Sequence, residues 1–487
     1  MPPSHSRSFY LTPVPEQECC KLIAGLKNSR TSKNVLPIHL FKLLSPIIAP
    51  PLTRIINECF KKAIFPNCLK VGRVIQIYKS GNKTDPSNYR PITTLPYISK
   101  LIEKCLTSRL VAFFDKFSLL TEFQYGFRAG ISTENAISHF CNLVYENFNS
   151  KKYLTGVLLD FRKTFDTISH DILLDKLQVY GVRGPPLQLI KSYLSNRKQF
   201  VSVNQVNSEV RPVNIGLPQG SCLAPFLFLV YINDLPNASQ LLQFTIFADD
   251  TTISISNDSY PQLVSDLNLE LNRVTEWTTS NRLTVNASKT NAIVFTNRNI
   301  PDIDQHIMLG SAPLNVLDDC RYLGVHIDSK LDFSLHINQI TRKIARNTGV
   351  FFKIRNYLPL KARLDFYYGF IYPYLIYGVT VWGGTYDCHL TKLTVQQKRI
   401  VRAMSDAGFR DHTRPLFFEL KLLNLEDIYR YFVAIFMFKN REKFRVNHDR
   451  ITRNLDLAIP PFCRITKCQH SIMFIGPGIW NSPLVSV

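Results

Sequence analysis

The sequence predicts an α+β protein whose centre alternates strands with helices and whose C-terminal region is helical. Short apolar runs such as Val71–Tyr78 and residues 155–160 have the length and β-branched content of strands. Between them, apolar residues recur at helical spacing, as they do over residues 99–117. Beyond about residue 333 the pattern is mostly helical and basic. Together these three observations favour the α+β class.

The elements follow one another in a definite order. Residues 1–50 are rich in proline, and we predict an irregular N-terminal segment there, with only a weak helix over 35–44. The segments that follow are predicted as a helix (52–65), a strand (71–78), a polar turn (79–88), a helix (99–117), a strand (155–160), a helix (171–180), two strands joined at residues 248–250 (242–255), a helix capped by Ser259, and strands over 283–295 and 320–327. We therefore expect three regions, 1–50, 52–327 and 333–487.

Composition excludes several classes of protein. With 45% apolar and 12% aromatic residues among 487, the chain can bury a sizeable core, so it is not a disordered protein. Eleven cysteines lie without paired spacing, which does not indicate a disulfide framework. The first residues, MPPSHSRSFYLTPVPEQ, contain no apolar run, so we expect no signal peptide and an intracellular location, nuclear or cytoplasmic.

Two long uncharged stretches, residues 212–233 and 366–386, are candidate membrane spans by length. Prolines, glycines and tyrosines interrupt both of them. A membrane-spanning helix needs about 20 mainly apolar residues. We therefore interpret both stretches as buried core and expect no membrane partner.

Charge is distributed unevenly along the chain. The formal net charge is +21, and it divides into +12 for residues 1–110, −4 for 111–329 and +13 for 330–487. An acidic middle between basic flanks suits carboxylates that hold cations while the flanks bind a phosphate backbone. The alternative is uneven surface charge without a function.

Three carboxylates form the strongest candidate site. Asp160 ends an apolar strand, and Asp249 and Asp250 lie between the apolar runs of a predicted hairpin, at its tip. If the two strands are neighbours, Asp160 and Asp249 meet at one edge of the sheet. Adjacent carboxylates repel unless cations neutralise them, and Mg²⁺ is bound by a few carboxylates together with substrate phosphates. An ordinary acidic turn is the alternative for Asp249 and Asp250.

A series of ordered motifs connects these carboxylates to a known family. The chain resembles the reverse transcriptases of non-LTR (LINE-type) retrotransposons, most closely the jockey-like group. The resemblance runs from about residue 52 to the C-terminus. It rests on blocks that stand in the family's order: NYRPI (88–92), QYGFR (124–128), LDFRKTFD (159–166), GLPQGS (216–221), YINDLP (231–236), FADD (247–250), LTVN (283–286) and YLG (322–324).

The resemblance implies a right-handed polymerase fold with fingers and a palm over 52–327 and a helical basic thumb and C-terminal region over 333–487. It implies RNA-directed DNA synthesis from dNTPs, with an RNA template and a DNA primer as partners. Two Mg²⁺ ions, with Mn²⁺ as the alternative, are the implied cofactors. The family's endonuclease domain does not appear in residues 1–50, so a separate or missing endonuclease is expected.

The resemblance also implies roles for single residues. Asp160 and Asp249 are implied metal ligands, with Asp250 as an accessory carboxylate and the backbone carbonyl of Phe161 completing one ion's shell. Phe165 is implied to exclude a 2′-hydroxyl, although a core aromatic is the alternative. For the remaining positions, the resemblance implies that the nucleotide is cradled by Gln219 and Gly220, that its triphosphate is held by Lys79 and Arg90, and that the leaving pyrophosphate is protonated by Lys289. The alternatives are an ordinary turn at Gln219 and Gly220, and solvated surface charges at the three cations.

Two other functions remain open on the sequence. An RNA-dependent RNA polymerase would share the carboxylates, but it typically has a polar residue five positions after the first aspartate, where this chain has Phe165. A catalytically inactive or co-opted element fragment would bind nucleic acid only. Phe165 therefore favours DNA synthesis over RNA synthesis. The intact Asp160, Asp249, Asp250, Gln219 and Gly220 argue against an inactive fragment.

Overall fold

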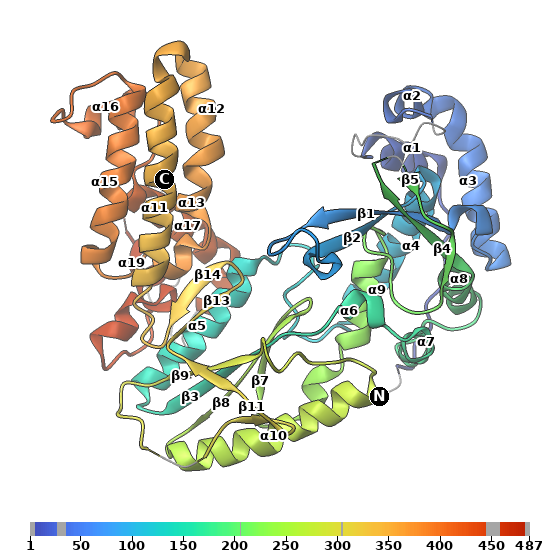
Figure 1. Cartoon of the computed structure of the whole chain (residues 1–487), viewed down its shortest axis with the longest axis horizontal. Helices are drawn as coiled ribbons and strands as arrows, with labels where there is room; N and C mark the ends of the chain where they lie inside the picture. Colours follow the sequence, from blue (N-terminus) through green and yellow to red (C-terminus); the bar gives the residue numbers. More distant parts are fainter. Residues whose placement is uncertain (1–4, 27–35, 205, 303–304, 445–457, 483–487) are drawn as a thin grey trace, which may run out of the picture. The chain divides into compact units, whose positions relative to one another are not determined.

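The computed structural model describes residues 5–26, 36–204, 206–302, 305–444 and 458–482, and it divides into two compact units (Figure 1). Unit 1 contains Met1–Ala129, Asp160–Leu241 and Glu270–Asn286. Unit 2 contains Gly130–Leu159, Leu242–Leu269 and Ala287–Val487. Both units mix helices and strands, which confirms the predicted α+β class. The three predicted regions remain predictions.

Unit 1 is built on a sheet with strand order β2-β1-β4-β5, in which β6 also pairs with β4. Strand β1 is antiparallel to β2 and parallel to β4. The elements of unit 1 are α1 (Glu16–Ala24), α2 (Ile38–Leu43), α3 (Ser45–Lys62), β1 (Val71–Tyr78), β2 (Tyr89–Thr94), α4 (Tyr97–Lys116), α6 (Thr164–Thr167), α7 (His170–Val179), α8 (Pro185–Leu194), β4 (Arg197–Val203), β5 (Val206–Asn207), β6 (Arg211–Val213), α9 (Ala224–Ile232), and the 3-10 helices η1 (Asn67–Leu69), η2 (Pro86–Asn88) and η3 (Leu235–Ala238).

Unit 2 is built on a sheet with strand order β12-β9-β3-β8-β7. Its elements are α5 (Thr133–Asn149), β3 (Tyr153–Leu159), β7 (Gln243–Phe247), β8 (Asp250–Asn257), β9 (Asn291–Phe295), β10 (Met308–Leu309), β11 (Ala312–Pro313), β12 (Asn315–Leu317), β13 (Asp319–Tyr322), β14 (Val325–Asp328), α11 (Ser334–Ile354), η4 (Arg355–Tyr357), α12 (Leu360–Phe370), α13 (Tyr372–Ile376), α14 (Val379–Trp382), α15 (Asp387–Met404), α16 (Thr413–Glu419), α17 (Leu425–Lys439), α18 (Arg441–Phe444), η5 (Thr466–His470) and α19 (Ile472–Trp480). Helix α10 (Tyr260–Ser280) begins in unit 2 and ends in unit 1.

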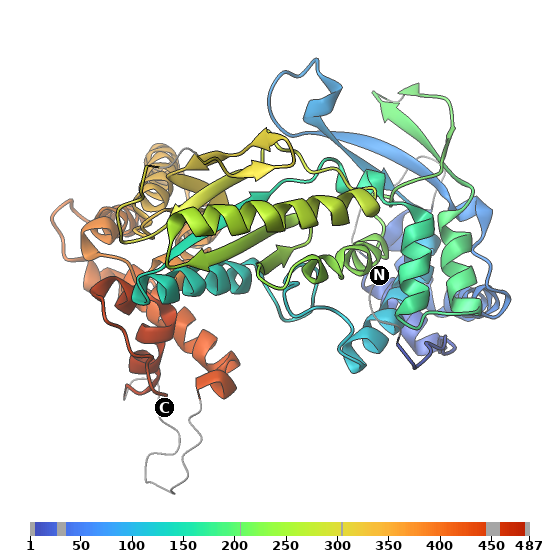
Figure 2. The same ribbon diagram turned by 90° about the horizontal axis from the view of Figure 1, so that it is seen from below.

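The central strand of unit 2 explains the apolar run that the sequence shows. Strand β3 is paired with β8 on one side and β9 on the other, and it is almost entirely buried. Helix α5 lies along one face of this sheet and the first part of α10 along the other (Figure 2). Phe140 of α5 packs edge-on against Phe295 of β9, with ring centroids 5.6 Å apart. A strand covered on both faces is mostly apolar and does not alternate with polar residues.

Two predicted segments differ from the structure. Residues 320–327, expected as one strand, belong to the hairpin β13–β14, because Leu323 and Gly324 both adopt positive φ and reverse the chain. Of residues 283–295, only Asn291–Phe295 form a strand of the sheet. Val285 instead makes an isolated bridge to Phe161.

The N-terminal segment is more regular than predicted. Within the described part of residues 1–50, helices α1 and α2 and the start of α3 are present. Pro15 directly precedes α1 with extended backbone, so this proline marks a helix start and not an irregular chain. Cys19 and Ile23, four residues apart, are both fully buried. Residues 1–4 and 27–35 lie outside the described residues.

The two uncharged stretches do not form membrane-spanning helices. Across the described ranges, no helix combines the length and the apolar character that crossing a bilayer requires. Within residues 212–233, helix α9 has eight buried residues. Within residues 366–386, Trp382 is fully buried against the ring of His336.

Candidate active site

The Asp249–Asp250 pair lies at the tip of a tight hairpin in unit 2. Strands β7 and β8 pair up to Phe247 and Asp250, which leaves Ala248 and Asp249 as the two turn residues. Ala248 has a φ of 57°, the left-handed conformation that short hairpin turns require. Both aspartates are exposed. The predicted hairpin is confirmed, and it exposes one carboxylate in its turn, Asp249, and one at the start of β8, Asp250.

Asp160 directly follows Leu159, the last residue of β3, which is paired with Thr251. Within unit 1, Asn286 holds Asp160 by two hydrogen bonds. The Asn286 backbone N–H donates to the Asp160 carbonyl at 2.6 Å, and its Nδ2 donates to the Asp160 Oδ2 at 3.1 Å. Sequence reasoning did not assign Asn286 a function, although its motif, LTVN, was among the matching blocks. The hydrogen bond from Asn286 Nδ2 favours one orientation of the Asp160 carboxylate.

The candidate metal ligands are hard oxygen donors. Asp160, Asp249 and Asp250 contribute carboxylates and Phe161 a backbone carbonyl, a donor set that suits Mg²⁺ or Mn²⁺. Within the described ranges, no three His, Cys, Asp or Glu side chains gather as a ready-made metal cage. Mg²⁺ is usually held by one or two carboxylates, with substrate phosphates and waters completing its shell. By their chemistry, these oxygen donors are of the kind that Mg²⁺ or Mn²⁺ accepts.

Phe165 is held in place by stacking. Its ring lies on that of Phe228 in α9, with centroids 4.8 Å apart and an interplanar angle of 29°. The Phe165 carbonyl accepts a hydrogen bond from the Leu217 N–H at 2.7 Å. Phe165 is half-buried. The ring is thus held by the stacking contact while part of it remains accessible.

The loop 216–221 is tied to strand β2. The Thr93 N–H donates to the Gln219 carbonyl at 2.6 Å. Gly220 has a φ of +125°, and a Cβ at this position would lie 2.3 Å from the Thr93 carbonyl oxygen. The glycine is therefore required by the close approach of β2, whatever its contact with a substrate.

A buried carboxylate anchors the same loop from the other side. Glu103 of α4 is fully buried and accepts hydrogen bonds from Ser221 Oγ and the Cys222 N–H, both at 2.7 Å, and from Ser99 Oγ at 2.9 Å. Burial raises the pKa of Glu103, and these three hydrogen bonds and the charge of Arg197 oppose that increase. Sequence reasoning missed Glu103, because a single acid in an amphipathic helix is normally a surface charge.

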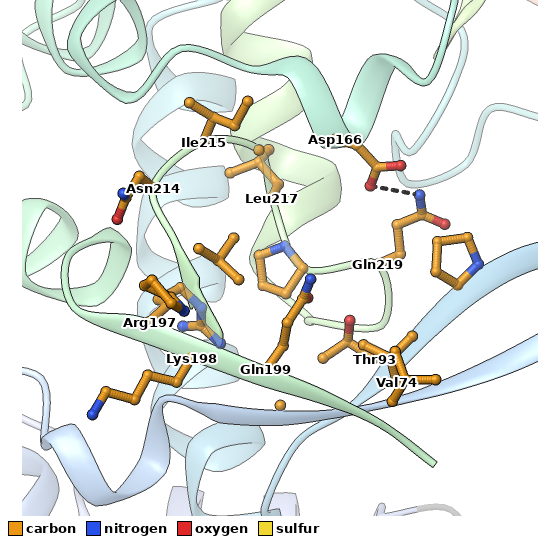
Figure 3. Close-up of a pocket in the computed structure, with 17 residues that line it drawn as sticks. Val74, Thr93, Asp166, Arg197, Lys198, Gln199, Asn214, Ile215, Leu217 and Gln219 are labelled. Carbon is orange, nitrogen blue, oxygen red and sulfur yellow. Dashed lines mark hydrogen bonds between the residues drawn. The ribbon is translucent and has the colours of Figure 1, made fainter. Parts of the chain in front are cut away.

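A cavity of about 400 Å³ lies between the sheet of unit 1 and the loop (Figure 3). Asp166 and Gln219 point toward one another at its edge, and Gln219 Nε2 donates to Asp166 Oδ1 at 2.9 Å. Burial raises the pKa of Asp166, whereas the hydrogen bond from Gln219 lowers it. The opposite wall comes from β1, β2 and β4, including Val74, Thr93 and Gln199. Asp166 was not predicted as a site residue.

The predicted cations are all exposed. Arg90 of β2 pairs with Ile77, two residues before Lys79, so the structure brings Arg90 and Lys79 to the same end of the β1–β2 hairpin in unit 1. Lys289 lies in unit 2, in the short connection that precedes β9. The roles predicted for these three cations remain predictions.

Comparisons with known proteins agree with the motifs. A family model described as reverse transcriptase (RNA-dependent DNA polymerase) matches residues 78–327, just over half of the chain. The RNA-directed DNA polymerase from the mobile element jockey of Drosophila melanogaster is 29% identical over 467 residues, covering 93% of this chain and 50% of the relative.

Two further relatives have similar sequence identity and coverage. The probable RNA-directed DNA polymerase from transposon X-element of Drosophila melanogaster is 27% identical over 465 residues, 92% of this chain and 51% of the relative. The jockey polymerase of Drosophila funebris is 27% identical over 454 residues, 90% of this chain and 48% of the relative. The chain thus spans about half the length of these curated relatives. Because the reverse transcriptase model covers just over half of the sequence, the chain belongs to the reverse transcriptase family.

Proposed function

We propose that the chain is the RNA-directed DNA polymerase of a non-LTR retrotransposon, and that it adds dNTPs to a primer 3′-hydroxyl on an RNA template. The observation that carries this proposal is the hairpin that presents Asp249 and Asp250, since β8 is paired with the strand that leads into Asp160. We assign the fingers and palm to residues 52–327 and the helical basic thumb and C-terminal region to residues 333–487.

In the proposed reaction, the primer 3′-hydroxyl attacks the α-phosphate of the dNTP and pyrophosphate leaves. Asp160 and Asp249 would hold two Mg²⁺ ions, aided by Asp250 and the Phe161 carbonyl. When bound, such a pair of ions activates the attacking hydroxyl and stabilises the leaving oxygen. Asn286 keeps the Asp160 carboxylate oriented for this task. A preoriented ligand avoids reorganisation during the reaction.

The positively charged residues would neutralise the substrates. Lys79 and Arg90 at the end of the β1–β2 hairpin would bind the triphosphate, Arg90 bidentately and Lys79 as a point charge. Lys289 would protonate the pyrophosphate. In unit 2, helix α15 exposes Lys398 and Arg399, whose charges suit the backbone of a template–primer duplex.

Phe165 would select deoxynucleotides. Its ring is fixed on Phe228, so it cannot move aside for a 2′-hydroxyl without losing the stacking contact. We expect Phe165→Ala to increase incorporation of UTP relative to dTTP by roughly 10- to 100-fold, the scale of a relieved steric clash. Primer extension on poly(rA)/oligo(dT) with each nucleotide measures this ratio.

The matched control is Phe123→Ala, which truncates another half-buried phenylalanine of unit 1. This control should leave the ratio of UTP to dTTP unchanged. A wild-type chain that prefers UTP would support an RNA polymerase and overturn the proposal. An unchanged ratio in Phe165→Ala would remove the role proposed for this ring.

A further inference from the structure

Two arginines lie over one exposed phenylalanine ring in unit 2. Phe352, near the end of α11, is 36% exposed. The guanidinium carbons of Arg355 in η4 and Arg399 in α15 lie 5.1 and 5.4 Å from the centre of its ring. Among the described residues, no acidic side chain forms an ion pair with either arginine. Two like charges held over the same ring without a counter-ion favour an anion beside them.

The helices that carry these arginines are basic over long stretches. Residues 333–364 contain seven Lys or Arg and residues 388–405 contain four, and neither range contains Asp or Glu. Helices α11 and α15 lie side by side within unit 2 (Figure 1). On α11, the exposed Arg342, Arg346 and Lys353 follow one another after four and seven residues, which places them on one face of the helix. A polyanion therefore complements this part of unit 2.

An open aromatic ring stands beside the two arginines. Tyr357, the last residue of η4, is 86% exposed. Its backbone is fixed, because the Leu358 N–H donates to the Arg355 carbonyl at 3.1 Å and Arg363 Nε donates to the Leu358 carbonyl at 2.9 Å. Arg363 Nη1 also donates to the Met404 carbonyl at 2.8 Å, which ties this connection to the end of α15. A ring displayed on a fixed backbone suits a partner with a flat apolar face.

Cations and open aromatic rings together distinguish between possible partners. A nucleic-acid duplex would satisfy the charges, but its bases are stacked on one another and offer no free face to Tyr357. An apolar protein surface would cover the rings but bury the arginines without counter-ions. A single strand offers phosphates and unpaired bases at once. Proteins that bind single strands typically combine a basic groove with aromatic side chains on which the bases stack.

We propose that Phe352, Arg355, Tyr357 and Arg399, here called the η4 surface, bind a single strand of nucleic acid. A base would stack on Tyr357, and the two arginines would hold phosphates. Such binding goes beyond the proposed polymerase reaction. For Arg399 it refines the proposed contact with a template–primer backbone, and in that respect it rests on the proposed function. An unpaired stretch of RNA and a DNA strand offer the same chemistry, so the test includes both.

The first test measures binding of the full chain to fluorescein-labelled oligo(rU), oligo(dT) and an abasic strand of equal length by fluorescence anisotropy. Tyr357→Ala removes a ring that is almost fully exposed, so the fold should be unchanged. We expect this variant to bind oligo(rU) or oligo(dT) at least about fivefold more weakly, the lower end for loss of one stacked base. Binding of the abasic strand should not change. A larger loss with oligo(rU) would identify RNA as the ligand, and a larger loss with oligo(dT) would identify DNA.

Salt dependence tests the two arginines. Each contact with a phosphate of a single strand contributes about 0.7 to the slope of log Kd against log salt concentration. Arg355→Gln/Arg399→Gln should therefore reduce this slope by about 1.4, for the abasic strand as well. An unchanged slope in the folded double variant would overturn the role of the arginines and with it the proposal.

The matched control is Tyr10→Ala, because Tyr10 is 79% exposed in unit 1, and it should bind each strand as the wild type does. Photo-cross-linking of a strand that contains 4-thiouridine locates the contact, since trypsin releases Tyr357 in the peptide 356–361. A cross-link in this peptide is expected. Its absence, or an equal loss of binding to the abasic strand in Tyr357→Ala, would overturn the proposal.

Failure of the η4 surface can be told apart from failure of the polymerase. A chain that makes DNA, but whose Tyr357→Ala variant binds oligo(rU) and oligo(dT) as the wild type does, would remove the single-strand site alone. A folded chain that makes no DNA but shows the expected cross-link and the expected loss in Tyr357→Ala would remove the polymerase function and support the single-strand site.

Discussion

Asp249→Asn is expected to reduce Mg²⁺-dependent incorporation of dTTP by at least about 100-fold while leaving the fold intact. Loss of a group that merely orients a metal ligand typically costs about 10- to 100-fold, and loss of the ligand itself should cost more. Asp249 is exposed in the two-residue turn between β7 and β8, so its carboxylate contributes no buried contact. The amide has the same shape and lacks the charge that would hold the metal.

The measurement is primer extension on an RNA template, together with thermal unfolding of each variant. Asp302→Asn, at an exposed position of unit 2, removes the same charge elsewhere and should retain wild-type activity. Wild-type incorporation by a folded Asp249→Asn variant would show that this carboxylate is not a metal ligand of the reaction.

Asp234→Ala is expected to lower the free energy of unfolding by about 3–5 kcal/mol, because it leaves a buried ammonium without its counter-ion. Lys176 and Asp234 expose only 2% and 3% of their side chains, and Lys176 Nζ lies 2.5 Å from Asp234 Oδ1. Nζ also donates to the Tyr231 carbonyl at 2.6 Å and lies 4.9 Å from the centre of the Trp277 ring. The pair therefore joins α7, the end of α9 and α10.

Urea unfolding measures this effect, and pH adds a second check. Burial lowers the pKa of Lys176, and the pairing with Asp234 partly opposes this decrease. Without Asp234 that pKa falls further, so the loss of stability should shrink as pH rises and Lys176 becomes neutral. The control Lys176→Met/Asp234→Leu removes both charges. It should lower the free energy of unfolding much less than Asp234→Ala does. An equal decrease in the free energy of unfolding in the two variants would mean that lost packing, and not the unpaired buried charge, causes the decrease.

The parts of the fold that depend on local pattern were predictable. Strand β1 matches its predicted bounds, and the Asp249–Asp250 hairpin follows from two apolar runs around a short polar turn. The β13–β14 hairpin was missed because Leu323, a residue that rarely adopts positive φ, reverses the chain there. Helix α1 was missed because prolines before a helix start resemble those of an irregular segment.

The residues that support the candidate site were not predictable in the same way. Asn286 contacts Asp160 across 126 residues of sequence, and Ser221 contacts Glu103 across 118. Each residue has an unremarkable local context, so only the tertiary structure reveals its partner. Matching motifs located the residues proposed to meet the substrate. They did not reveal the buried acid and the amide that hold these residues in place.

RNA-templated DNA synthesis by the wild-type chain tests the central proposal most directly. The measurement is incorporation of labelled dTTP on poly(rA)/oligo(dT) with Mg²⁺, repeated after the template has been digested with ribonuclease. We predict a product that resists alkali, that requires the metal and that is not formed on the digested template. A folded wild-type chain that binds the duplex with salt-dependent affinity but makes no product would contradict the proposal and leave a nucleic-acid-binding protein.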